Sequence, residues 1–174
     1  MARCGRVTGI ETFFDRDEVI VSKTNTKGII TYANRTFLNI SGYGESEVIG
    51  KPHNIIRHPD MPRCIFKFLW ETLQSGQEVF AYVVNLSKAG NHYWVLAHVT
   101  PSFDDDRNIV AFHSNRRVPE REPLDATIIP LYRTLIECER RADDPAAGLR
   151  ASYDTLRGML QEKGVGYEQF IFSL

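Results

Sequence analysis

The chain has 174 residues, of which 43% are hydrophobic and 25% are charged, with 21 Lys and Arg against 22 Asp and Glu. This length fits one domain of roughly 100–150 residues with an appendage, and the apolar content is enough for a core. The formal net charge of −1 excludes a basic footprint for nucleic acid, and no apolar run approaches the ~18–20 residues of a membrane span. We therefore expect a cytoplasmic sensing or binding module, too short to carry an output kinase as well.

The three cysteines, Cys4, Cys64 and Cys138, lie far apart in the sequence. Their odd number and the lack of a CxxC motif indicate reduced cysteines in a reducing compartment rather than a disulfide framework. His53, His58 and Cys64 could be drawn together as a metal site, but their spacing matches no zinc pattern. We expect no metal.

The first half of the chain predicts two short strands and then helices. Residues 18–23 contain three β-branched residues in a row and 29–32 form a second short strand, so the two make a hairpin. Asn34 is a good N-cap for the short helix that follows. Apolar residues recur at helical spacing over 63–74, which predicts a longer helix ended by Gly76.

Three long β-prone runs follow, at 78–88, 91–103 and 108–116. The short separators between them are typical of hairpin turns, so the runs form a three-stranded meander. Within the middle run we expect one parity to face inward: Tyr93, Val95, Ala97 and Val99. Together with the first hairpin, this order predicts an α+β fold, with a five-stranded antiparallel sheet and helices on one face.

The strand pattern stops after residue 117. Residues 117–124 are expected to be a linker, and Pro130 must start, end or kink the helix that contains it. Residues 146–163 carry apolar side chains at spacings of three and four, so the tail is expected to be a helical hairpin. The predicted domains are a lead-in at 1–17, a sensor domain at 18–118 and a helical tail at 119–174.

Several motifs resemble those of PAS domains, in particular residues 28–34 (GIITYAN), 41–43 (SGY) and 47–52 (EVIGKP). The resemblance is closer to the FAD-binding PAS domains of aerotaxis receptors. It rests on HNIIRHPDMP at 53–62, on Phe66 and Trp70 on the next helix, and on NHYWV at 91–95. It covers about residues 18–135 and implies noncovalent FAD binding and a redox signal, without catalytic turnover. The expected protein is a redox or energy sensor, not an enzyme.

The resemblance implies a set of cofactor-binding residues: Asn34, His53, Arg57, His58, Asp60, Phe66, Trp70 and Asn85. Arginine and histidine side chains suit phosphate oxygens, and an Asn amide suits the polar edge of a flavin. Each residue also has a structural alternative. Trp70 could be core, Asp60 could cap the next helix, Asn85 could face outward and Asn34 could be only an N-cap.

Other sensor types fit the sequence less well. A light-sensing LOV domain needs a reactive cysteine, and His53 stands at that place. A haem-binding gas sensor needs a proximal histidine on the pocket helix, and residues 63–74 contain none. A cofactor-free PAS interaction module is the remaining alternative.

The chain as given contains no transmembrane, HAMP or methyl-accepting region. The resemblance therefore implies a partner, namely a membrane-bound or soluble chemoreceptor or signalling protein that lacks its own PAS domain. The apolar stripe of the tail, Leu149, Tyr153, Leu156 and Leu160, must be buried on the sheet, on its hairpin mate or on a second copy in a homodimer.

Overall fold

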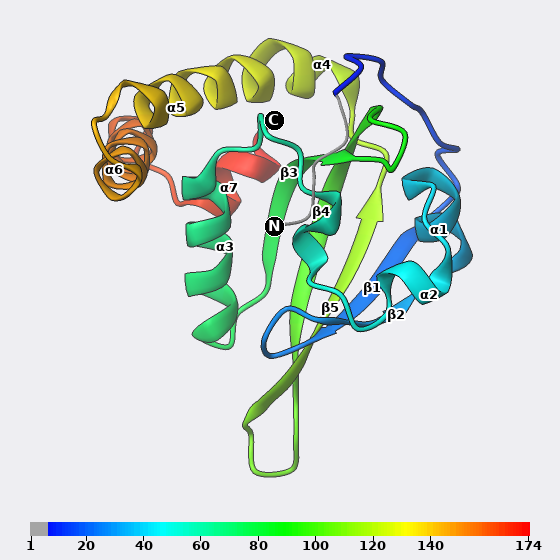
Figure 1. The fold of residues 1–174 in the computed structure, drawn as a ribbon. Coiled ribbons are helices and arrows are strands. Elements are labelled where there is room, and N and C mark those ends of the chain that lie inside the picture. The colour runs from blue at the N-terminus through cyan, green and yellow to red at the C-terminus, as the bar shows by residue number, and fades with distance from the viewer. Residues whose placement is uncertain (1–6) are drawn as a thin grey trace. The chain divides into compact units, whose positions relative to one another are not determined.

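The computed structural model describes residues 7–174 and separates them into two compact units (Figure 1). The first unit contains the described residues up to His58 and Thr72–Pro119, and the second contains Pro59–Glu71 and Glu120–Leu174. The second unit thus includes a segment that the sequence-based boundaries assign to the sensor domain, and those boundaries stay a prediction.

The first unit is built on a five-stranded antiparallel sheet with the strand order β2-β1-β5-β4-β3. Its strands are β1 (Ile20–Asn25), β2 (Ile30–Ala33), β3 (Val79–Leu86), β4 (His92–Phe103) and β5 (Ile109–Arg117). β5 occupies the centre of the sheet although it is the last strand along the chain. This confirms the predicted α+β fold and all five expected strands.

The turn between β3 and β4 shows why these strands pair in a single register. Gly90 has a φ of 91°, a conformation that residues with a Cβ rarely adopt. Its amide donates to the Ser87 carbonyl, and the Ser87 amide donates to the Asn91 carbonyl at 2.7 Å. These bonds close the hairpin and set Asn85 opposite Tyr93.

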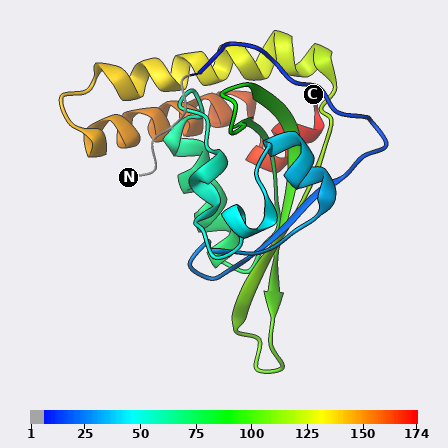
Figure 2. The same ribbon diagram turned by 45° about the vertical axis from the view of Figure 1, so that its right-hand side comes forward.

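One face of this sheet carries the short helical elements α1 (Arg35–Ser41), α2 (Glu45–Val48) and η1 (His53–Ile56) (Figures 1 and 2). Asn34 begins α1, because its side chain accepts from the Phe37 amide at 2.9 Å. The His53 amide donates to the carbonyl of Gly28 in the β1–β2 turn at 2.9 Å. This backbone bond holds η1 beside the first hairpin.

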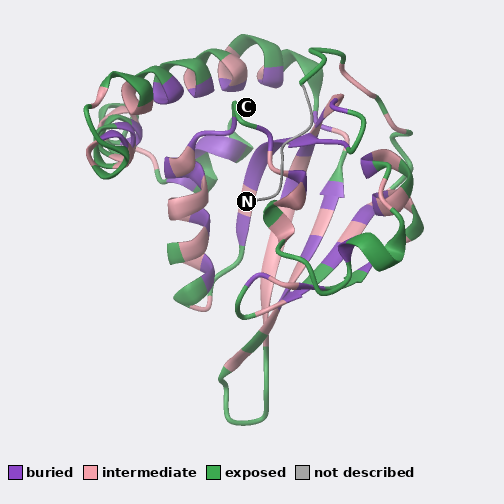
Figure 3. Cartoon of the chain, viewed as in Figure 1, coloured by how far each residue is buried: buried purple, intermediate pink, exposed green. Residues whose placement is uncertain are grey.

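Burial alternates along β1, β5 and the first half of β4, whereas β3 is buried over nearly its whole length (Figure 3). Tyr93, Val95 and Ala97 are buried, whereas Trp94 and His98 are partly exposed, which confirms the predicted inner parity over this part of β4. Val99, the fourth residue predicted to face inward, is only half-buried. Phe37 from α1 is fully buried on the same side. The inner face is therefore a core surface, and its polar residues are buried with it.

The second unit is helical. It consists of α3 (Arg63–Gln74) as far as Glu71, and of α4 (Arg121–Pro123), η2 (Leu124–Ile128), α5 (Ile129–Arg141), α6 (Pro145–Lys163) and α7 (Tyr167–Phe172). The bounds of α3 match the predicted helix. The predicted linker at 117–124 is wrong in its second half, because residues 121–124 are helical. Pro130 has no amide proton to donate, and the π-helical turn η2 precedes it at the start of α5.

Helices α5 and α6 pack side by side as a hairpin (Figure 2), which confirms the predicted tail. Asp144 begins α6 by accepting from the amides of Ala146 and Ala147, and Gly164 ends it with a φ of 66°. The buried face of α6 differs slightly from the predicted stripe. Its residues are Gly148, Ser152, Leu156 and Leu160, whereas Leu149 and Tyr153 are only half-buried.

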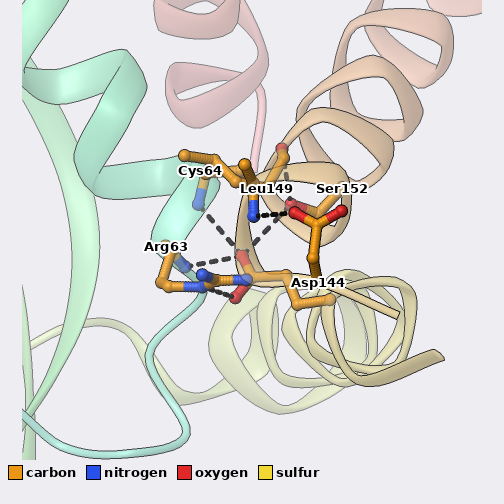
Figure 4. Close-up of polar contacts among 7 residues, drawn as sticks. Arg63, Cys64, Asp144, Leu149 and Ser152 are labelled. Atoms are coloured by element: carbon orange, nitrogen blue, oxygen red, sulfur yellow. Dashed lines mark hydrogen bonds and ion pairs between the residues drawn. The ribbon is translucent and has the colours of Figure 1, made fainter. Parts of the chain in front are cut away.

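A carboxylate from α5 caps the first turn of α3. Glu139 accepts from the Arg63 amide at 2.7 Å, from the Cys64 amide at 3.1 Å and from the Arg63 Nε at 2.8 Å. The Ser152 hydroxyl of α6 donates to the same side chain at 3.1 Å, and Figure 4 shows Arg63, Cys64 and Ser152 close together. Asp60 forms an ion pair with Arg140, and the expected alternative in which it caps this helix stays a prediction.

The described part of the chain contains two cysteines, and neither forms a disulfide. Cys64 is buried and Cys138 is partly exposed, and both are free thiols, while Cys4 lies outside the described residues. Burial raises the pKa of the Cys64 thiol to about 11. Over residues 7–174, no helix combines the length and apolarity needed to span a membrane. The cytoplasmic location stays a prediction.

Candidate functional site

The inner face of the first unit's sheet carries a row of buried polar side chains. Cross-strand pairs point to the same face, and Ser22 pairs with Ser114 while Asn85 pairs with Tyr93. Arg116 lies two residues beyond Ser114 and therefore shares this face. We call these residues, with His53 of η1, the inner-face polar cluster: Ser22, His53, Asn85, Tyr93, Ser114 and Arg116.

Arg116 is the central group of the cluster and is only 4% exposed. One guanidinium nitrogen, Nη2, donates to the Ser22 hydroxyl at 2.8 Å and to His53 Nε2 at 2.7 Å. The guanidinium carbon lies 5.8 Å from the centre of the Phe37 ring. Burial lowers the pKa of Arg116 to about 10, so the group remains a cation at neutral pH.

His53 acts as the neutral partner of this cation. A guanidinium only donates hydrogen bonds, so Nε2 must accept and the ring carries its proton on Nδ1. Burial, followed by the nearby Arg116 charge, lowers the pKa of His53 to about 3. The structure thus brings one predicted site residue, His53, into contact with two that were not predicted, Ser22 and Arg116.

Acid should destabilise the protein through His53. Its pKa of about 3 lies below the ordinary value of 6.5, so the unfolded chain binds an extra proton between those values. The free energy of unfolding should fall by up to about 1.4 kcal/mol per pH unit as the pH drops through the range between these two pKa values. Above that range the ring is neutral in both states, so His53 has no effect on the pH dependence. Urea unfolding of the wild type and His53→Gln from pH 4 to 7 measures the difference. Equal pH slopes in the two proteins would contradict the assignment.

Four polar atoms of the cluster are buried with no hydrogen-bond partner among the described residues: Asn85 Nδ2, Tyr93 Oη, Ser114 Oγ and Arg116 Nη1. Each such atom costs about 1–3 kcal/mol if it stays unsatisfied. Burial also raises the pKa of the Tyr93 hydroxyl, so that group keeps its proton and can donate. The atoms suit a flat ligand with carbonyl oxygens and ring nitrogens at its edges, as a flavin has.

Arg57 and His58 follow η1 directly. The backbone of Arg57 forms a bridge with Asn85, which places the polar loop against the end of β3. His58 is buried, and its ring lies 5.7 Å from that of His92. The structure therefore brings Arg57 beside the predicted residue Asn85, and the alternative in which Asn85 faces outward is wrong, since Asn85 is 4% exposed.

Asn34 has a structural role. Its Oδ1 accepts from the amides of Phe37 and Val21, and its Nδ2 donates to the Val19 carbonyl at 2.7 Å. Both acceptor positions and one donor of the amide are therefore bonded to backbone. The N-cap interpretation of Asn34 is confirmed, and little of its side chain is left for a cofactor.

Three predicted residues belong to the second unit: Asp60, Phe66 and Trp70. Asp60 is exposed and forms an ion pair with Arg140 at 3.1 Å. Phe66 and Trp70 are four residues apart on one face of α3, and both are half-buried rather than core. Their contact with a cofactor stays a prediction.

Four groups of the cluster are not predicted from the sequence: Ser22, the Tyr93 hydroxyl, Ser114 and Arg116. One signal could have found Arg116, since it has the same strand parity as Phe112 and Ser114 in the last strand. Over the described residues no group of three or more His, Cys, Asp and Glu side chains is arranged to hold a metal ion.

The chain is similar in sequence to a known protein family and to several known proteins. Residues 30–116, half of the chain, match the family model of the PAS fold. The chain is 39% identical to the aerotaxis receptor of Escherichia coli over 129 residues, or 74% of this chain and 25% of the receptor. It is 25% identical to a blue-light-activated histidine kinase of Rhizobium johnstonii over 68% of this chain and 34% of the kinase. It spans about a quarter to a third of the length of these relatives.

Solved structures with a similar fold are LOV domains. The light-state LOV domain of the photoreceptor aureochrome 1 aligns with a TM-score of 0.56 and 21% identity, over 63% of this chain and 88% of that chain. A LOV domain studied with a flavin analogue aligns with a TM-score of 0.56 and 20% identity, over 67% of this chain and 87% of that chain. Identities this low establish the fold alone. The family match and the five-stranded sheet together show that the chain belongs to the PAS-fold family.

Proposed function

We propose that this protein is a redox sensor of the aerotaxis type, which binds FAD noncovalently at the inner-face polar cluster. The observation that supports it best is the set of four buried polar atoms without partners, centred on Arg116. The similarity to an aerotaxis receptor supports the same class of function. The flavin would supply reversible electron transfer with cellular electron carriers, and no turnover of a substrate is proposed.

Different residues of the first unit would contact different parts of the cofactor. The Asn85 amide and the Tyr93 hydroxyl would bond polar atoms at the ring edge, because both are buried donors on adjacent strands. Phe37 supplies an aromatic surface beside Arg116. Arg57 and His58 are proposed for the phosphates, as basic side chains at the end of the same region. Asn34 is not part of the proposed set.

The redox signal would be read by another protein. We propose a chemoreceptor or signalling protein without its own PAS domain as the partner, in line with the similarity to an aerotaxis receptor. Helix α3 provides a route within the second unit. Its first turn is bonded through Glu139 to α5 and, through Ser152, to α6. A displacement of α3 would therefore change the positions of α5 and α6 through these hydrogen bonds.

An absorption spectrum of the purified full chain tests the proposal. We expect a yellow protein whose blue absorption is bleached by dithionite, and whose heat-released cofactor co-elutes with FAD rather than FMN on chromatography. Tyr93→Phe should lower cofactor retention more than Tyr32→Phe, its matched control, because Tyr93 is fully buried in the cluster whereas Tyr32 is 47% exposed. A colourless protein that takes up neither flavin on reconstitution would overturn the proposal and favour the cofactor-free interaction module.

A further inference from the structure

Arg116 is a buried cation without a carboxylate. Its bonds go to the Ser22 hydroxyl and to His53 Nε2, which are both neutral, and no acidic side chain among residues 7–174 pairs with it. Its second terminal nitrogen, Nη1, is buried and forms no hydrogen bond with any of residues 7–174. Glu139 offers a contrast, because its side chain is only 9% exposed and is paired with Arg63 at 2.8 Å.

Such a charge is costly. Removing an ion from water is strongly unfavourable unless an opposite charge and further hydrogen bonds compensate for it. Arginine also keeps its proton at neutral pH, so it does not escape the cost by becoming neutral. The neutral Ser22 oxygen and His53 nitrogen stabilise the guanidinium only in part. A negative charge placed near Nη1 would stabilise the guanidinium further.

We propose that Arg116 is the charge-selecting residue of the flavin site: it favours the bound ring in the redox state with the larger negative charge. This inference rests on the proposed function. A two-electron reduction by a cellular electron carrier, or by dithionite in vitro, that takes up one proton adds one negative charge to the ring. The site therefore binds the reduced ligand more tightly than the oxidised one, and by thermodynamic linkage raises its reduction potential.

The surroundings of Arg116 favour the ring over the phosphates as the source of that charge. The guanidinium lies on the central strand β5, beside the Phe37 ring and under electrostatic influence of Tyr93. Flat aromatic neighbours suit a flat aromatic ligand. A phosphate group, whose charge does not change on reduction, would gain equally from Arg116 in both redox states.

The test compares the dissociation constants of oxidised and dithionite-reduced FAD for the full chain and for two charge variants. Arg116→Gln removes the charge but keeps donors, and Arg116→Lys keeps the charge. We expect Arg116→Gln to lower the preference for the reduced ligand about tenfold, equivalent to a fall of about 30 mV in the two-electron potential. Arg116→Lys should keep most of the preference.

A third variant tests the same charge effect without replacing Arg116, in case Arg116→Gln does not fold. Ser22→Asp leaves the arginine in place and sets a carboxylate at the position of a hydroxyl that is 2.8 Å from it. It should also lower the preference for the reduced ligand. If Arg116→Gln lowers the affinity for oxidised and reduced FAD equally, the inference is overturned. If riboflavin, which has no phosphate, then binds the variant as well as it binds the wild type, Arg116 contacts a phosphate instead. If the wild type binds flavin in neither state, the proposed function itself fails.

Discussion

Replacing Glu139 with glutamine is expected to lower the free energy of unfolding by about 2–4 kcal/mol. The carboxylate accepts hydrogen bonds from two amides in the first turn of α3, from Arg63 Nε and from the Ser152 hydroxyl. Glutamine keeps one acceptor oxygen but turns an NH₂ group toward donors and leaves Arg63 without its counter-charge. A negative charge also favours the N-terminal end of a helix, and the amide lacks it.

Glu137→Gln is the matched control, because it removes a carboxylate from the same helix. Glu137 is exposed, and its pair with Arg141 is an i,i+4 surface contact at 3.1 Å. Such pairs contribute less than about 0.5 kcal/mol. Urea unfolding followed by circular dichroism compares the two variants. Equal midpoints for Glu139→Gln and Glu137→Gln would show that the carboxylate does not hold α3 to the hairpin.

Two glycines of α6 should respond to alanine in opposite directions. A Cβ at Gly148 would lie 2.5 Å from the Glu139 backbone carbonyl and 3.1 Å from its Cα, so α5 and α6 would have to separate. We expect Gly148→Ala to cost about 1–3 kcal/mol. A Cβ at Gly158 would meet nothing within 4 Å, and Gly158→Ala should gain about 0.5–1 kcal/mol from helix propensity.

The two variants share a helix and a substitution, so helix propensity is the same for both and packing alone separates them. Gly148 is buried in the hairpin interface whereas Gly158 is not. Thermal unfolding midpoints give the comparison directly. If Gly148→Ala were as stable as the wild type, the close approach of α5 and α6 would not exist in solution. A loss in Gly158→Ala would contradict the open surroundings of that position.

Local sequence patterns determined most of the fold. The five strands and α3 were predictable because their signals are local: β-branched runs, helical spacing over 63–74, and breakers such as Gly76 and Gly90. The linker at 117–124 was mispredicted because the two prolines, Pro119 and Pro123, resemble loop punctuation. Proline in a first helical turn forfeits no hydrogen bond, so Pro123 is compatible with the helix there.

The candidate site was predictable only in part. The polar loop motif led to His53, Arg57 and His58, and the strand predicted at 78–88 led to Asn85. His53 and Asn85 lie in the inner-face polar cluster. Arg116 was missed because SNRR at 114–117 looks like the polar end of a strand. Its importance comes from pairing with residues at least 63 positions away, a relation that strand register and not local sequence defines.

By itself the sequence determined which segments are helices and strands, which parity of β4 faces inward, and the resemblance to PAS domains. Only the tertiary structure decided what the buried polar groups contact. The sheet order puts β5 between β1 and β4, and this sets Arg116 beside Ser22 and near Tyr93. Likewise, only folding brings Glu139 to the start of α3. The physical reason is that local periodicity fixes the direction of a side chain, whereas its partner depends on which distant strands and helices become neighbours.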